Sequence, residues 1–217
     1  MDEYLSEKEQ LERIREWWRE NGWYLIAGVA LGAVGIFGWN QYKAYVQARA
    51  EAAAALYLDL QDVLQDDDRT AAEALLAELR EEHPKSPYTD QAGMLIAGYY
   101  VATEPSRAAD ELRFVMDRTE DRDLARIARL RLARVLIYQD RHEEALALLD
   151  VPNLGPFTAQ YREAAGDAHY ALGNTDAARA AYEEALRAPG AEWLNRSFVE
   201  MKLDALEVAD DSAETGT

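Results

Sequence analysis

One stretch near the start of the chain carries no charged side chain. It covers residues 21–42, and residues 23–39 within it are almost entirely apolar residues and glycine. At about 1.5 Å of rise per residue, these 22 residues form a helix of roughly 33 Å, and the hydrocarbon core of a bilayer is about 30 Å thick. The pattern predicts a single transmembrane helix over residues 21–43, preceded by a tail of residues 1–20.

Two other structures produce a similar apolar stretch. A core helix of a soluble protein seldom runs this far without a polar face. A cleavable signal peptide is the stronger alternative, because Ala48-Arg49-Ala50 has the small residues of a cleavage site. That site lies 11 residues beyond Trp39, however, and the apolar run exceeds the usual length of about 7 to 15 residues. An uncleaved anchor is therefore favoured, and it agrees with the Trp and Tyr residues at both ends of the stretch.

The orientation of this helix follows from the Lys and Arg residues beside it, since acidic residues contribute little to topology. Four precede the helix and two follow it: Lys8, Arg13, Arg15 and Arg19, then Lys43 and Arg49. The bias predicts a cytoplasmic N-terminus and export of everything after about residue 43. In the tail, the spacing of Ser6 and Glu9 predicts a capping box that starts a helix. A regulatory contact through the tail stays open.

Three glycines lie on one stripe of the predicted membrane helix. Gly28, Gly32 and Gly35 follow the spacing i, i+4, i+7, so another backbone can approach this face closely. The stripe is a candidate docking face for the membrane helix of a partner, and an ordinary lipid-facing anchor is the alternative.

Beyond residue 44, apolar positions recur every three or four residues without a β alternation, so residues 44–206 are predicted to be an all-α domain. A helix-turn-helix pattern of about 34 residues repeats along it. It is clearest twice, with a shift of 33 residues: at Leu132, Ala133, Leu136, Ala145 and Leu149, then at Ala165, Gly166, His169, Ala178, Tyr182 and Ala185. Fainter units precede these, at Leu95, Tyr99, Ala108, Leu112 and Val115, and at Ala72, Leu76, Leu79 and Pro84.

The residue types in this repeat have physical roles. Small residues let two antiparallel helices cross closely, larger ones fill the space between neighbouring pairs, and proline ends the second helix. Residues 52–190 therefore resemble the tetratricopeptide family. We expect an all-α protein with one transmembrane helix followed by a tetratricopeptide-repeat α-solenoid.

The C-terminal end of the domain carries one more amphipathic segment without a partner in the repeat. Because a solenoid cannot leave its last apolar face in water, we expect a capping helix whose apolar residues are packed. These residues are Trp193, Leu194, Phe198, Met201 and Leu206. Residues 207–217 are small and acidic, and we expect them to be disordered.

Composition excludes several classes of protein. The chain has no cysteine, so a disulfide framework, a cysteine zinc site and a thiol nucleophile are excluded. It has 23 Lys and Arg against 41 Asp and Glu, a net charge of −18 that argues against nucleic acid as a partner. From residue 51 onward there are 17 basic and 34 acidic residues. Such an acidic domain steers basic client segments or reflects a salt-rich habitat, and both explanations stay open.

The sequence lacks the motifs of the common enzyme classes. His83, His142 and His169 are far apart, none has a second His or Cys at ligand spacing, and His169 occupies an aromatic core position of the repeat. The chain has no G-x-S-x-G, no phosphate-binding glycine loop and no HExxH. We expect no catalysis, no cofactor, no metal and no small-molecule substrate.

Several motifs together give the chain a distinctive layout. They are Glu20-Asn-Gly22, Val29-x-Leu31-Gly32 and Gly38-Trp39 around the anchor, and Arg131-Leu-Ala-Arg-Val135, Arg162-x-x-x-Gly166-Asp167, Gly173-Asn-x-Asp176 and Met201-Lys202-Leu203 in the repeats. Over nearly its whole length, the chain resembles the YfgM family of ancillary SecYEG translocon subunits. It departs from that family in being unusually acidic.

The resemblance implies a non-catalytic, single-pass protein of the bacterial inner membrane with its repeat domain in the periplasm. Members of the family work beside SecYEG, commonly with the membrane-anchored periplasmic chaperone PpiD, in handing exported chains to folding factors. An envelope scaffold of another assembly, in outer-membrane insertion or cell-wall synthesis, is the alternative. The resemblance leaves the oligomeric state open.

A tetratricopeptide array offers a concave surface rather than a catalytic cleft. We expect its inward helices, around Tyr99, Arg131, Arg134 and Tyr138, to receive a peptide or a partner domain. Arg131 and Arg134 also belong to a basic patch in an acidic domain, together with Arg126 and Arg129. Solvation or pairing with nearby Glu is the alternative role for these arginines.

Overall fold

The computed structural model describes the backbone of residues 7–215 and the side chains of residues 9–206. It contains nine α-helices within this range: α1 (Glu7–Gln65), α2 (Arg69–Glu82), α3 (Pro87–Tyr100), α4 (Pro105–Arg118), α5 (Arg122–Tyr138), α6 (His142–Leu149), α7 (Thr158–Ala171), α8 (Thr175–Arg187) and α9 (Arg196–Thr215). Two short 3-10 turns, Gly155–Phe157 and Ala191–Trp193, precede α7 and α9. No strand occurs among residues 7–215, so the predicted all-α fold is confirmed.

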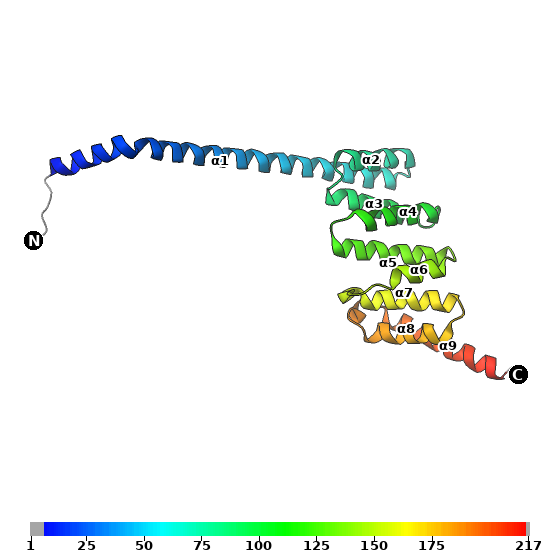
Figure 1. Ribbon diagram of the computed structural model, residues 1–217. Coiled ribbons are helices and arrows are strands. Elements are labelled where there is room, and N and C mark those ends of the chain that lie inside the picture. Colours follow the sequence, from blue (N-terminus) through cyan, green and yellow to red (C-terminus); the bar gives the residue numbers. More distant parts are fainter. Residues whose placement is uncertain (1–6, 216–217) are drawn as a thin grey trace, which may run out of the picture. The chain divides into compact units, whose positions relative to one another are not determined.

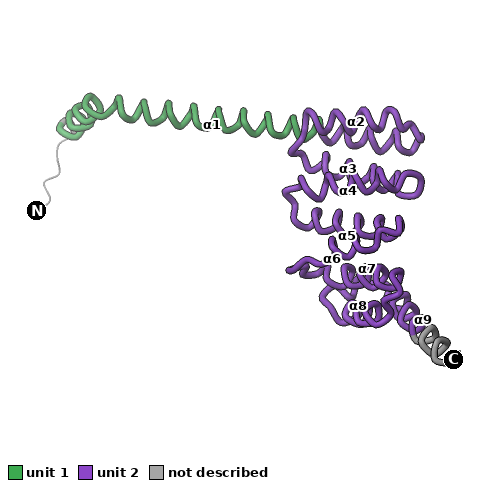
Figure 2. Tube along the Cα trace, turned by 45° about the vertical axis from the view of Figure 1, so that its right-hand side comes forward, with its two compact units in different colours: residues 1–52 green, residues 53–217 purple. Residues whose placement is uncertain are grey.

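The chain divides into two compact units, Met1–Ala52 and Ala53–Thr217 (Figure 2). In the first unit, nearly every described side chain of α1 is exposed, including those of the apolar stretch. This helix is long and apolar enough to cross a membrane. The predicted boundaries between tail, anchor and domain stay predictions, and the predicted capping residue Ser6 lies outside the described residues.

The second unit is a stack of helical hairpins (Figure 1). The C-terminal part of α1 is followed by α2, and then α3 and α4, α5 and α6, and α7 and α8 form successive pairs before α9. The helix starts follow from local chemistry. Asp68 accepts a hydrogen bond from the backbone N–H of Ala71 (3.0 Å), and Asp121 accepts one from that of Leu124 (3.1 Å). The succession of helix pairs agrees with the expected α-solenoid.

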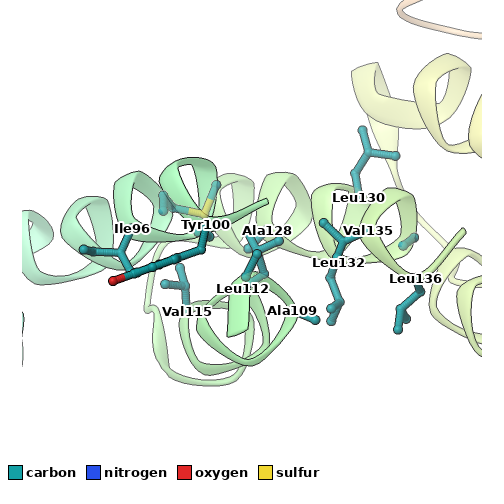
Figure 3. Close-up of a cluster of buried hydrophobic side chains, with 14 of the residues drawn as sticks. Ile96, Tyr100, Ala109, Leu112, Val115, Ala128, Leu130, Leu132, Val135 and Leu136 are labelled. Carbon is teal, nitrogen blue, oxygen red and sulfur yellow. The ribbon is translucent and has the colours of Figure 1, made fainter. Parts of the chain in front are cut away.

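Large side chains from neighbouring pairs share one core. Ile96 and Tyr100 of α3, Val115 of α4, and Leu132 and Leu136 of α5 are all buried in it (Figure 3). The small residues of the repeat act as expected, because a Cβ at Gly166 would lie 2.4 Å from Cε1 of Tyr182. A larger side chain at such a position would force the two helices of the pair apart.

The packing of α9 differs from the expectation. Val199 and Leu206 are buried, whereas Trp193, Phe198 and Met201 are 60%, 46% and 55% exposed. The prediction that these two aromatic side chains and Met201 are packed is therefore wrong. The inward face of α9 is set by the i, i+4, i+7 spacing of Val199, Leu203 and Leu206. Phe198 and Met201 lie on a different face, and Trp193 belongs to the turn before α9.

The backbone of α9 continues to Thr215. The side chains from residue 207 onward and residues 216 and 217 lie outside the described part. The expected disorder of residues 207–217 therefore stays a prediction.

Candidate functional site

Two adjoining cavities form a groove on the repeat domain. The first has a volume of about 730 Å³ and is lined by residues of α1, α3 and α5: Tyr57, Gln61, Leu64, Gln65, Gln91, Met94, Leu95, Gly98, Tyr99, Leu124, Ile127 and Arg131. The second, of about 410 Å³, is lined by Met94, Ala97, Gly98, Val101, Leu112, Arg131, Arg134, Val135 and Tyr138. We call the two together the inner groove.

Three residues line both cavities and therefore lie where they adjoin: Met94, Gly98 and Arg131. Gly98 is exposed within α3, and a Cβ there would have no heavy atom within 4 Å. The missing side chain keeps the floor of the groove open at its middle.

The two arginines of the groove differ in their pairing. Arg134 Nη2 lies 3.1 Å from a carboxylate oxygen of Glu163, whose other oxygen lies 3.1 Å from Lys202 Nζ. Arg131 is exposed, and it joins no ion pair within the described part of the chain. Among the described residues, none of those lining either cavity is an Asp or Glu. The groove is thus apolar with a free guanidinium at its centre.

The two tyrosines lie at different places in the groove. Tyr99 lines the first cavity, donates a hydrogen bond to Asp67, and packs edge-on against Tyr100 with ring centroids 5.0 Å apart. Tyr138 lines the second cavity and is 68% exposed. The structure therefore brings Tyr99, Arg131, Arg134 and Tyr138 to one groove, while their binding role stays a prediction.

The expected basic patch on α5 is partly neutralised. Arg126 Nη1 lies 2.7 Å from a carboxylate oxygen of Asp123, and its Nη2 donates to the backbone carbonyl of Asn153 (3.0 Å). Arg134 is paired as described above. Of these arginines, Arg131 is the one that remains free toward the groove.

Sequence reasoning did not predict the glutamines of the groove. Gln61, Gln65 and Gln91 line the first cavity, two from the end of α1 and one from α3. The side-chain amide of Gln61 donates to the Tyr57 hydroxyl (3.2 Å). Glutamines within helices carry no signal of their own, and only the packing of α3 beside the end of α1 brings these three to one cavity.

The strongest pKa shifts belong to buried tyrosines outside the groove. Burial raises the pKa of Tyr161 to about 12, and its hydroxyl donates to the backbone carbonyl of Arg126 (2.8 Å). Burial, aided by a hydrogen bond to Asp167 (2.7 Å), also raises the pKa of Tyr182. Both hydroxyls tie neighbouring helices together, which is a structural role.

No histidine belongs to a candidate metal-binding group in the described residues. His142 Nε2 lies 3.8 Å from a carboxylate oxygen of Asp140, and the Nδ1 atoms of His142 and His169 are buried without a hydrogen-bond partner. No group of three or more His, Cys, Asp or Glu within the described range is placed to hold a metal ion.

The glycine stripe of α1 presents an open face. At Gly28, Gly32 and Gly35, a Cβ would have no heavy atom within 4 Å. Nothing within the described chain covers this face, so the backbone is accessible to another helix. Its use as a docking face stays a prediction.

Comparison with known protein families identifies the repeat domain. Residues 15–208 match the model of the tetratricopeptide repeat-like domain. The chain belongs to this family. No solved structure matches it.

This tetratricopeptide repeat-like protein is also similar to curated proteins named ancillary SecYEG translocon subunit. It is 27% identical to the one from Neisseria gonorrhoeae over 209 residues, covering 95% of this chain and all of the relative. It is 28% identical to the one from Haemophilus influenzae over 93% of this chain and 98% of the relative. For the Escherichia coli protein, the identity is 27% over 96% of this chain and all of the relative. The similarity expected from the sequence motifs is confirmed, and it extends through the long apolar helix as well as the repeats.

Proposed function

We propose that this protein is an ancillary subunit of the SecYEG translocon. It holds a repeat domain at the periplasmic face of the bacterial inner membrane. The observation that carries the proposal is the full-length similarity to relatives that bear this name, with the apolar helix and the repeat domain in the same order. The predicted anchor and the positive charge before it support a cytoplasmic N-terminus.

The role is that of a non-catalytic scaffold. The inner groove receives a segment of an exported chain or of a membrane-anchored periplasmic chaperone of the PpiD type, so that the emerging chain passes to folding factors. The apolar lining and the open floor at Gly98 support this role, because apolar concave surfaces bind polypeptide segments. Anchoring raises the local concentration of the groove where chains leave the membrane.

The anchor adds lateral contact within the membrane. Gly28, Gly32 and Gly35 let the helix of a translocon subunit approach closely, while the remaining faces contact lipid. Ala30 lies on the opposite side of the helix, since it is about 200° around the axis from Gly28 at about 100° per residue.

Photo-crosslinking in cells tests the proposal. A photoreactive amino acid at Gly32 should capture SecY, SecE, SecG or a membrane-anchored chaperone, and the same probe at Ala30 should capture mainly lipid. If both probes capture only lipid or the protein itself, and the mature chain is cleaved near Ala50, the translocon role is wrong. The protein is then a released periplasmic scaffold of another envelope assembly.

A further inference from the structure

The charge of the inner groove is opposite to that of the domain around it. From residue 51 onward, acidic residues outnumber basic ones by 34 to 17. Yet within the described part of the chain the lining of the groove includes two arginines and no Asp or Glu. The cavity between α6 and α7, by contrast, has both an acidic and a basic residue in its lining, Asp150 and Arg162. The overall charge favours basic clients, whereas the groove itself is suited to an acidic group.

Arg131 is the group in the groove that can pair with a ligand. Arg134 already pairs with Glu163, and Tyr99 already donates to Asp67. Arg131 is exposed and free of ion pairs in the described structure. A guanidinium with its donors in solvent binds a carboxylate through charge-assisted hydrogen bonds.

The position of Arg131 indicates what kind of carboxylate it meets. Apolar lining continues on both sides of it, with Leu95 and Ile127 in one cavity and Leu112 and Val135 in the other. Leu112 and Val135 belong to the cluster of Figure 3. A segment that fills both cavities therefore passes Arg131 in its middle. The matching carboxylate is a side chain within the segment rather than the end of a chain.

The glutamines that line the first cavity suit an extended backbone. Gln61, Gln65 and Gln91 offer amide donors and acceptors beside the apolar lining. An extended segment has backbone N–H and C=O groups that need partners when water is displaced, whereas a helix satisfies them internally. Three glutamines in the lining are therefore of most use to an extended segment.

We propose that the inner groove selects an extended segment of a partner polypeptide in which one Asp or Glu side chain, placed against Arg131, is flanked by apolar side chains. This rests on the proposed function of the groove and adds the chemical class of its ligand. A run of acidic residues does not fit, because the acidic surface repels it beyond the groove. A single carboxylate avoids most of this repulsion, since charges more than about 8 Å away are screened at physiological salt.

Peptide binding to the full-length protein in detergent micelles tests this. The probes are fluorescent peptides of Leu and Ser, blocked at both ends and identical except for a central Glu, Gln or Lys. We expect the Glu peptide to bind about five-fold more tightly than the Gln peptide, since an exposed ion pair contributes up to about that factor. The Lys peptide should bind most weakly.

Two variants of α5 give a matched comparison. Arg131→Glu should reverse the order, so that the Lys peptide binds best. Arg122→Glu makes the same charge change at an exposed residue of α5 that does not line the groove, and it should leave the order unchanged. Equal binding of the Glu, Gln and Lys peptides, or an equal response to both variants, would overturn the selection.

A third variant separates this inference from the groove itself. Gly98→Trp fills the middle of the groove where the backbone has open space, so it should abolish binding of all three peptides. If Gly98→Trp abolishes binding but the central residue has no effect, the groove binds segments without selecting an acid. If Gly98→Trp leaves peptide binding intact, the groove is not the binding site. Self-association that Gly98→Trp prevents would identify a second copy as the occupant and contradict the proposal.

Discussion

The ring of Tyr182 in α8 lies directly over the backbone of Gly166 in α7, with its hydroxyl hydrogen-bonded to Asp167. A Cβ on Gly166 would overlap the ring, and the ring is buried with little space to move. We expect Gly166→Ala to lower the free energy of unfolding by about 1–3 kcal/mol, as overpacked cores do. Urea unfolding of the full chain in detergent, followed by circular dichroism, measures this.

Gly98→Ala is the control for that change. It is also a glycine within a helix, but its Cβ would meet nothing. Because alanine favours helix over glycine by about 0.5–1 kcal/mol, this variant should be as stable as the parent or slightly more stable. Equal destabilisation by both variants would contradict the close approach at Gly166.

Lys202 fastens α9 to the last pair of helices. Its Nζ lies 3.1 Å from Glu163 and 2.7 Å from Asp167, and all three side chains are largely buried. Lys202→Met keeps most of the side chain but removes the charge between the two carboxylates. We expect the free energy that holds α9 closed to fall by about 1–3 kcal/mol, which is measured as faster hydrogen exchange of the α9 amides.

The exposed pair on the same helix provides the comparison. Arg196 Nε lies 2.9 Å from Glu200, and both side chains are about half exposed or more. Arg196→Met should change the opening free energy of α9, derived from hydrogen exchange, by less than about 0.5 kcal/mol. If the two variants behave alike, Lys202 does not hold α9 in place.

Alkaline pH should weaken the domain through its buried tyrosines. The pKa of Tyr161 is raised from 10.0 to about 12, and that of Tyr182 is raised as well. The folded state keeps these protons after the unfolded state has lost them. The stabilisation is therefore complete below pH 10 and is lost as the pH rises toward 12. The free energy of unfolding, measured by urea titration at pH 8, 9.5 and 11, should fall above pH 10 by at most about 1.4 kcal/mol per pH unit for each tyrosine.

Tyr→Phe variants show which tyrosine causes this fall in stability with pH. Tyr161→Phe should cost about 1 kcal/mol at pH 8, since the hydrogen bond to Arg126 is lost, and should reduce the decline above pH 10. Tyr138→Phe, at an exposed position, should preserve both the stability and the decline. An unchanged decline in Tyr161→Phe would show that this group does not contribute.

The repeat fold could be predicted because its signals are local and periodic. Small residues such as Gly166 and large ones such as Tyr182 recur at fixed spacing, and the spacing determines which helices meet. The face of α9 could not be predicted in the same way. Phe198 and Val199 are adjacent apolar residues, and only the position of α9 against its neighbours determines that Val199 is buried and Phe198 is exposed.

The groove was partly predictable for the same reason. The inward positions of α3 and α5 identified Tyr99 and Arg131 from the repeat. The contribution of Gln65 depends on α1 continuing as a helix into the first pair, which the apolar pattern of the anchor does not indicate. The difference between free Arg131 and paired Arg134 depends on Glu163, 29 residues away from Arg134 in the chain.

The most direct test of the account is a photoreactive amino acid at Gly98 in cells that carry a secretory chain arrested in the translocon. We predict adducts with the arrested chain or with a membrane-anchored periplasmic chaperone, formed only while the chain is arrested. The same probe at Asp117, an exposed residue of α4 that does not line the groove, should form few. Adducts that are equally frequent at both positions, or that do not depend on the arrested chain, would contradict a groove that receives exported chains.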